Sequence, residues 1–167
     1  MLRFQHHLNM FKAIPLYLTL LVPVSAENLF ENSKMNTAGG WKGSKRIIVE
    51  DKVGQEEENR VLRVTAKKRD QVTFSQEVES RDVTDFVVKL RYRSKDYGGR
   101  GLELRGVRQS GSHTFFTFKI TADGEWHDIS MNYSQVQGSN RIDFNFIVLE
   151  GEGDVHFDDI TVEAMKK

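Results

Sequence analysis

Apolar and polar residues alternate along most of the chain after residue 26. The clearest example is Asp85–Ser94, in which the alternate apolar residues are Phe86, Val88, Leu90 and Tyr92. Side chains of a β-strand point to its two faces in turn, so such a segment has one buried face and one solvated face. We find no convincing segment with the apolar spacing of an amphipathic helix. The pattern therefore predicts an all-β protein.

Residues that favour turns separate the alternating segments at short intervals. Gly, Asn, Asp and Ser recur between them, and Ala122–Gly124 has the composition of a hairpin turn. About ten short strands separated in this way are typical of an antiparallel β-sandwich. The expected strands are residues 28–32, 46–50, 61–66, 71–78, 85–94, 102–109, 113–121, 126–133, 141–149 and 153–163.

The last expected strand changes phase in its middle. Its apolar residues form two pairs of opposite parity, Val155 with Phe157 and Ile160 with Val162. A bulge at Asp158–Asp159 would keep both pairs in the core. Adjacent carboxylates repel each other unless a positive charge lies between them, and Ca²⁺ prefers such oxygen ligands. The residues alone leave two interpretations open, a calcium site or two solvated aspartates.

Length and charge are those of one globular domain. The chain has 167 residues, no cysteine, and 24 basic against 24 acidic side chains. This length allows a single sizeable core. A net charge of zero argues against a general nucleic-acid binder, which normally has a basic excess.

The first 26 residues have the layout of a secretory signal peptide. Arg3 and Lys12 precede the apolar run Ala13–Val24, and small residues follow it up to Ala26. The apolar run is shorter than the roughly 20 residues that a membrane-spanning helix needs. We therefore expect residues 1–26 to be removed, which leaves residues 27–167 as one exported domain, secreted or periplasmic. An uncleaved anchor is the alternative.

The order of several short motifs resembles the CenC-type carbohydrate-binding modules. These modules are jelly rolls of the galactose-binding-like group. The similarity extends over residues 27–167. It is carried by Asn28-Leu29, Asn32, Gly40-Trp41, Val61–Val64, Phe74–Val78, Phe86–Ser94, Gly124–His127 and Val155–Ile160. The resemblance implies a jelly roll that binds a polysaccharide without catalysis.

The resemblance also implies a structural calcium ion. In such modules the ion commonly bridges the first strand region and the final Asp-Asp strand. The corresponding residues of this chain are Glu31, Asn32, Asp158 and Asp159. An ion at this place would join the two ends of a domain that has no disulfide.

Four aromatic side chains are candidates for stacking on a sugar ring. Trp41 lies in a glycine-rich segment, where it is either a platform or the residue that pins a loop. Phe115 has the parity opposite to Phe116 and faces outward, so it is either a platform or a second apolar contact. Tyr97 is in a turn and could stack at a rim. Trp126 begins a strand, where it either contacts ligand or fills the end of the core.

A basic stripe follows the solvated face of one expected strand. It consists of Lys89, Arg91 and Arg93, and Arg105 could extend it from the next strand. Arginine suits the carboxylate or sulfate groups of an acidic polysaccharide. The alternative is an ordinary solvated face with ion pairs to residues such as Glu103.

A binding module is the function that we expect. Its ligand would be a polysaccharide or oligosaccharide, neutral or anionic, on the solvated face of a sheet, and the domain would be a monomer. We expect no nucleic-acid partner and no membrane partner after signal cleavage. A protein-interaction or structural sandwich of the cell surface or matrix is the first alternative. A small glycan-acting hydrolase is the second, although no nucleophile elbow or zinc motif is present and no acid pair stands out.

Overall fold

The computed structural model describes residues 27–31, 33, 40–43, 47–51, 60–80, 83–111, 113–135 and 140–165. The expected signal peptide lies outside these residues. In the described part of the chain no helix is long and apolar enough to cross a membrane. The strands are β1 Lys42–Gly43, β2 Ile47–Asp51, β3 Arg60–Ala66, β4 Val72–Glu79, β5 Asp85–Ser94, β6 Leu102–Arg108, β7 His113–Phe118, β8 Trp126–Ser134, β9 Arg141–Val148 and β10 Gly153–Ala164.

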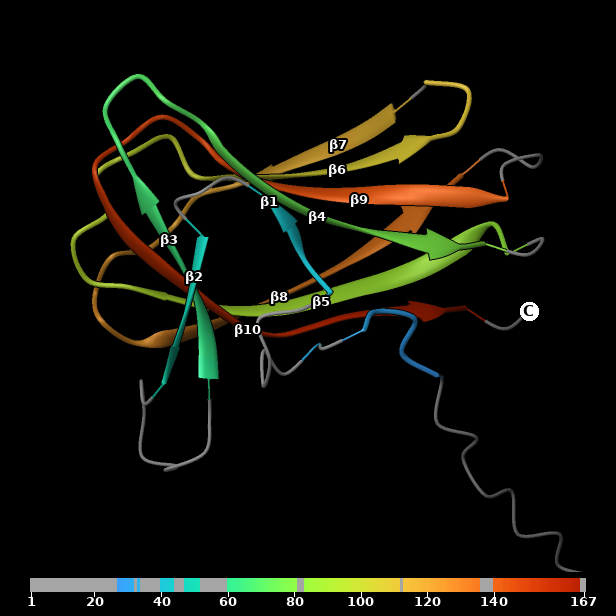
Figure 1. The fold of residues 1–167 in the computed structure, drawn as a ribbon, viewed down its shortest axis with the longest axis horizontal. Coiled ribbons are helices and arrows are strands. Elements are labelled where there is room, and N and C mark those ends of the chain that lie inside the picture. The colour runs from blue at the N-terminus through green and yellow to red at the C-terminus, as the bar shows by residue number, and fades with distance from the viewer. Residues whose placement is uncertain are drawn as a thin grey trace, which may run out of the picture.

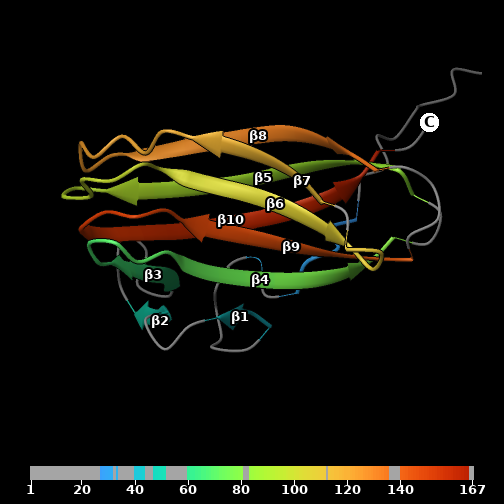
Figure 2. The same ribbon diagram turned by 90° about the horizontal axis from the view of Figure 1, so that it is seen from above.

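The strands form two sheets that pack face to face. Sheet I has the order β1-β4-β9-β6-β7, and sheet II has the order β2-β3-β10-β5-β8. The two layers are seen edge-on in Figure 1 and from above in Figure 2, where β7 and β8 share one side of the molecule and β1 and β2 share the other. All strand pairs are antiparallel. The predicted antiparallel jelly-roll sandwich is confirmed.

The core lies between the sheets and is rich in aromatic rings. Phe74 of β4 stacks on Phe146 of β9 with ring centroids 5.1 Å apart. Tyr133 of β8 meets Phe144 of β9 edge-on, also at 5.1 Å. These residues occupy the buried parity of their strands, as the alternation predicts. Complete burial of such a side chain contributes about 1.5–3 kcal/mol to folding.

The predicted bulge in the last strand is present. The register between β10 and β5 shifts between Asp158 and Thr161, and Asp159 has a φ of 47°. Aspartate tolerates this left-handed conformation better than most residues. The shift restores the phase, so both apolar pairs of β10 face the core and are fully buried.

The first expected strand is not a regular strand. Asn28 forms an isolated bridge with Glu163, and the amide of Leu29 donates to the carbonyl of Val162 at 2.8 Å. Further on, the backbone of Glu31 turns away and bonds the side chain of Gln76 in β4. The segment therefore pairs only briefly with β10 before it crosses toward sheet I.

Candidate functional site

The structure separates the predicted ligand-binding residues into three groups. Arg105 and Phe115 lie on the outer face of sheet I. Lys89, Arg91, Arg93 and Trp126 lie on the outer face of sheet II, on the opposite side of the molecule. Trp41 and Tyr97 pack into or against the core.

A row of side chains crosses the outer face of sheet I from edge to edge. Phe115 in β7 is in register with Arg105 in β6, and Arg105 is in register with Asn145 in β9. The row continues through Ser75 in β4 to Lys42 in β1. Phe115 is 56% exposed, and among the described residues only Met165 is another large apolar side chain that is exposed. We call this row the Phe115 face.

Hydrogen bonds fix the polar groups at the centre of this face. The guanidinium of Arg105 donates from Nε to Glu103 Oε1 at 2.9 Å, and its Nη2 contacts the same oxygen. The side-chain amide of Asn145 donates to the carbonyl of Asp143 at 3.1 Å. The side chains are thus held in place before any ligand arrives, which reduces the entropy lost on binding.

Sequence analysis did not select Asn145 or Ser75. Both residues have the outward parity of strands that were correctly expected, so the alternation that places Phe144 and Phe146 in the core also points Asn145 outward. What the sequence lacks is the strand order, because β4, β9, β6 and β7 are neighbours in sheet I without being consecutive.

The basic stripe is largely neutralised. Lys89 Nζ lies 3.0 Å from Glu163 of β10. Arg91 pairs with Asp128 at 3.4 Å and with Asp159 at 3.5 Å. The alternative of a solvated, ion-paired face therefore describes this part of the stripe.

The expected extension of the stripe to Arg105 is wrong. The connection from β5 to β6 passes from sheet II to sheet I, so Arg105 faces the opposite direction from Arg91. Consecutive strands of a jelly roll commonly change sheets, and alternation within each strand carries no information about this change.

Trp126 lies at the start of β8 and does not fill the core. It is in register with Arg93 on the outer face of sheet II. The guanidinium groups of Arg91 and Arg93 lie over its ring, 5.3 and 5.0 Å from the centroid. Such cation–π contacts orient the arginine side chains.

Trp41 is not a surface platform. Its ring packs against Phe30 at 5.3 Å, Phe74 at 5.6 Å and Phe146 at 5.8 Å. The indole instead packs against the core at the β1 edge of the sandwich. The alternative interpretation, a loop pinned by one aromatic residue, agrees with this packing.

Tyr97 is also a core residue, and the expected position at a rim is wrong. Its side chain is 5% exposed, and its hydroxyl donates to the carbonyl of Leu149 at 3.0 Å. The same oxygen accepts from the amide of Gly101 at 3.1 Å. A Cβ added at Gly99 would lie 2.3 Å from the ring, so glycine is what leaves room for it. Burial raises the pKa of the Tyr97 hydroxyl, against the effect of the hydrogen bond with Gly101.

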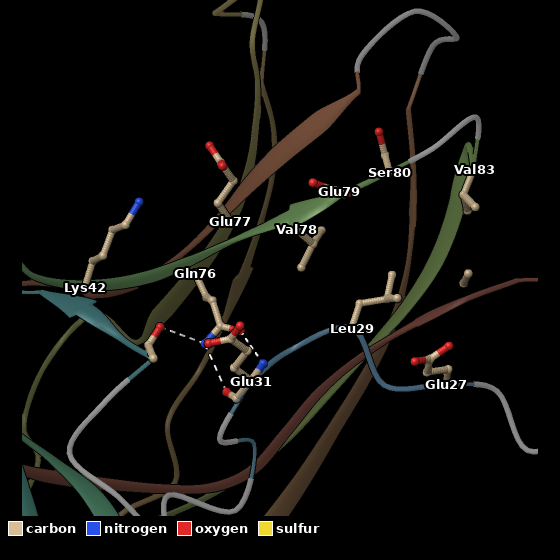
Figure 3. A pocket seen from close by; sticks show the side chains of 12 residues that line it. Glu27, Leu29, Glu31, Lys42, Gln76, Glu77, Val78, Glu79, Ser80 and Val83 are labelled. Atoms are coloured by element: carbon tan, nitrogen blue, oxygen red, sulfur yellow. Dashed lines mark hydrogen bonds between the residues drawn. The ribbon is translucent and has the colours of Figure 1, made fainter.

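A cavity of about 650 Å³ opens at the edge of the sandwich beside β4. Figure 3 shows Leu29 and Val78 inside it and Lys42 and Glu77 at its outer side. Gln76 forms part of its wall. The side-chain amide nitrogen of Gln76 donates to the carbonyls of Glu31 and Gly40 at 3.0 and 2.8 Å, which fixes this wall. The cavity begins where the Phe115 face ends, since Lys42 belongs to both.

The described residues do not by themselves complete a calcium site. They contain no group of three or more acidic or histidine side chains that could hold a metal. Asp159 pairs with Arg91, and Glu31 is exposed beside the edge cavity. Asp158, by contrast, is 2% exposed and accepts a hydrogen bond from the amide of Asp159. Asn32 lies outside the described residues.

No protein-family model and no curated protein sequence matches the chain. Solved structures share its fold. A family 61 carbohydrate-binding module in complex with β-1,4-galactotriose has 18% identity and a TM-score of 0.58 over 84% of this chain and 100% of its own. The CBM22-1 xylan-binding domain of Paenibacillus barcinonensis Xyn10C has 14% identity and a TM-score of 0.57 over 85% and 94%.

The enzymatically active domain of tailspike protein 4 of bacteriophage CBA120 is also similar. It has 12% identity and a TM-score of 0.62 over 83% of this chain. The chain spans only 21% of the length of that protein. At these identities the comparisons show the fold alone, which the chain shares with these carbohydrate-binding modules and with part of the tailspike protein.

Proposed function

We propose that the chain is an exported, non-catalytic carbohydrate-binding module that holds a polysaccharide or oligosaccharide on the Phe115 face. The observation that carries this proposal is an exposed phenyl ring in one row with Arg105 and Asn145. Sugar rings present an apolar C–H side and polar hydroxyl edges. A flat aromatic ring beside fixed polar side chains matches both.

The similar structures support the class of ligand. Two of them are named for binding β-1,4-galactotriose and xylan, and their domains are about as long as the part of this chain that they match. On this face the carboxylate of Glu103 is engaged by Arg105, and that of Glu77, which is in register with Asp143, is engaged by Arg141. We therefore propose binding without hydrolysis. The proposal includes export, a monomeric state, and no nucleic-acid or membrane partner.

Removal of the phenyl ring should abolish most of the affinity. We expect Phe115→Ala to weaken glycan binding at least tenfold, which corresponds to about 1.4 kcal/mol. Affinity electrophoresis of residues 27–167 against a panel of polysaccharides would find the ligand, and calorimetry would measure the loss.

Met165→Ala is the matched control, because Met165 is 41% exposed and lies away from this face. It should leave the affinity unchanged. If folded Phe115→Ala binds the glycan as tightly as the unmodified chain, the site is wrong. If no glycan binds but a protein partner does, the sandwich is a protein-interaction module.

We also propose that Asp158, and not Asp159, is the carboxylate of the calcium site that the family resemblance implies. Burial of Asp158 supports this choice, and the ion pair between Asp159 and Arg91 argues against the alternative. A ligand that binds only the folded state raises the melting temperature. We expect calcium to raise it relative to a chelator in the unmodified chain and in Asp159→Asn, but not in Asp158→Asn. An equal calcium response of all three would contradict the assignment.

A further inference from the structure

A second cavity lies on the opposite side of the molecule from the Phe115 face. Its volume is about 340 Å³, at the lower end of the roughly 300–1,000 Å³ of small-molecule sites. It opens at one end of sheet II, between the loop after β5, the turn before β8 and the start of β10. Its lining residues are Arg93, Ser94, Lys95, Asp96, Gly124, Asp154 and His156. We call it the Arg93 cavity.

Its walls are held together by a buried serine. Ser94 is 1% exposed, and its hydroxyl donates to the carbonyl of Asp154 at 2.7 Å and accepts from the amide of Tyr97 at 3.1 Å. Its own carbonyl accepts from the amide of Gly124 at 2.8 Å. One residue thus connects β5, β10 and the turn before β8, so the cavity exists without a ligand.

The acidic side chains of the cavity already have partners. Asp96 accepts a hydrogen bond from the amide of Asp154 at 3.0 Å. The carboxylate of Asp154 lies 3.9 Å from the guanidinium of Arg63. Their negative charge is therefore compensated in part by groups other than the cations that line the cavity.

Arg93 and Lys95 differ from these carboxylates, because neither forms an ion pair with another described residue. In the described part of the chain, the contact of the Arg93 guanidinium is with the ring of Trp126, and no carboxylate lies within ion-pair distance of it. Lys95 is exposed and has no ion pair with any described residue. Lys89 and Arg91 are neutralised along the same strand, so the positive charge of the stripe is available only at its Arg93 end.

We infer that the Arg93 cavity is a second binding site, which takes one sugar unit that carries a carboxylate or sulfate group. The guanidinium of Arg93 would donate two parallel hydrogen bonds to the oxyanion, with Lys95 as a second cation. Trp126, which lies beside the cavity, holds the guanidinium in place. The inference rests on the proposed function only in that the ligand is a glycan, because it uses different residues on the other sheet.

The test compares three probes that differ in charge. They are an oligogalacturonate, the same oligosaccharide with its carboxylates methyl-esterified, and a sulfated galactan oligosaccharide. We expect the unmodified chain to bind at least one charged probe about tenfold more tightly than the neutral one. Arg93→Gln should lose this preference. Lys119→Gln, which removes a positive charge elsewhere on the surface, should keep it.

The combination of variants separates this inference from the proposed function. Phe115→Ala should weaken the neutral probe, which depends on the Phe115 face, and should leave the charged probe bound at the Arg93 cavity. If Arg93→Gln keeps the preference, or if the unmodified chain shows none, the Arg93 cavity is not an anion site. A preference for only one charged probe identifies the carboxylate or the sulfate as the group recognised.

Nuclear magnetic resonance gives a readout at the site itself. The chain has two tryptophans, so its spectrum contains two indole N–H signals. The charged probe should shift the signal of Trp126 and leave that of Trp41, which packs against the core. A titration that leaves the Trp126 signal unmoved would overturn the inference.

Discussion

Tyr97 connects two loops through one hydroxyl group. The oxygen donates to the carbonyl of Leu149 and accepts from the amide of Gly101, while the ring fills the space beside Gly99. Buried backbone groups cost free energy when they lose their partners. A residue expected to contact ligand is therefore a determinant of loop structure.

Removal of this hydroxyl should destabilise the fold. We expect Tyr97→Phe to lower the free energy of unfolding by about 1–3 kcal/mol, because the amide of Gly101 and the carbonyl of Leu149 lose a buried partner. Urea denaturation would measure the change. Tyr133→Phe is the control, since the hydroxyl of Tyr133 makes one long bond of 3.4 Å to Gly106 and should cost less. Equal losses in the two variants would contradict this account.

The Tyr97 hydroxyl also makes the stability of the fold depend on pH. Burial raises the pKa of Tyr97, so the folded chain keeps this proton at a pH where the unfolded chain, with a tyrosine pKa of about 10, has released it. The stability that this proton contributes is fully present below the pKa of tyrosine in the unfolded chain. It is lost as the pH rises through the higher pKa of Tyr97 in the folded chain. Alkaline unfolding of Tyr97→Phe should lack this contribution. An identical alkaline decrease in both proteins would refute it.

At the residue scale, the sequence predicts which face of a strand a side chain occupies. It does not predict where side chains outside the strands lie. The alternation correctly turned Phe115 outward and Phe116 inward. The alternation does not predict whether Trp41 and Tyr97 are buried, because both lie in glycine-rich segments in which apolar and polar residues do not alternate. The glycines around Tyr97 were the available clue, because a chain without side chains at these positions leaves room for a ring.

The bulge in β10 accommodates one extra residue in the strand. It keeps the apolar residues on both sides of it pointing to the core. Three steps along β10, from Asp158 to Thr161, correspond to two steps along β5. If the same sequence formed a regular strand without a bulge, Ile160 and Val162 would point out of the core. The two aspartates thus have a structural reason for their position in addition to any ion.

Two single-residue deletions should have opposite outcomes. Deletion of Asp159 removes the extra residue and leaves a regular strand with Ile160 and Val162 still inward, so we expect a folded protein. Deletion of Thr161 turns Val162 outward and Glu163 inward, which exposes an apolar side chain and buries a charge. Near-ultraviolet circular dichroism and urea denaturation would distinguish them. If the two variants are equally stable, the bulge does not set the phase.

At the element scale, most of the strands and the bulge could be predicted from the sequence. The bounds of β5 agree with those expected, and β4, β6, β8 and β9 differ by a residue or so at their ends. The assignment of strands to sheets could not be predicted, because it depends on contacts between segments far apart in the sequence. That is why Arg105 was placed beside the wrong strand.

The segment from Asn28 to Ser33 holds the two sheets together along one edge. It bonds β10 of sheet II, where the amide of Ile160 donates to the carbonyl of Ser33 at 3.1 Å. Gln76 of sheet I is 6% exposed and bonds the amide and carbonyl of Glu31. The edge cavity lies between this segment and β4, because residues of both line it.

Loss of the Gln76 amide should loosen this edge of the whole molecule. We expect Gln76→Leu to lower the free energy of unfolding by about 2 kcal/mol and to accelerate hydrogen exchange at the amide of Leu29. Gln71→Leu is the matched control, because Gln71 is exposed and makes one bond of 3.4 Å to Glu150. If exchange at Leu29 is the same in both variants, the segment is held by other contacts.

The position of β10 has a consequence for how the chain folds. The last strand is the central strand of sheet II, between β3 and β5, and it also pairs with Asn28 near the other end of the described chain. Sheet II therefore cannot close until residue 164 has left the ribosome. Pairings between such distant segments fold slowly, in milliseconds to seconds. A nascent chain of this design keeps the two halves of sheet II apart until β10 has been synthesised.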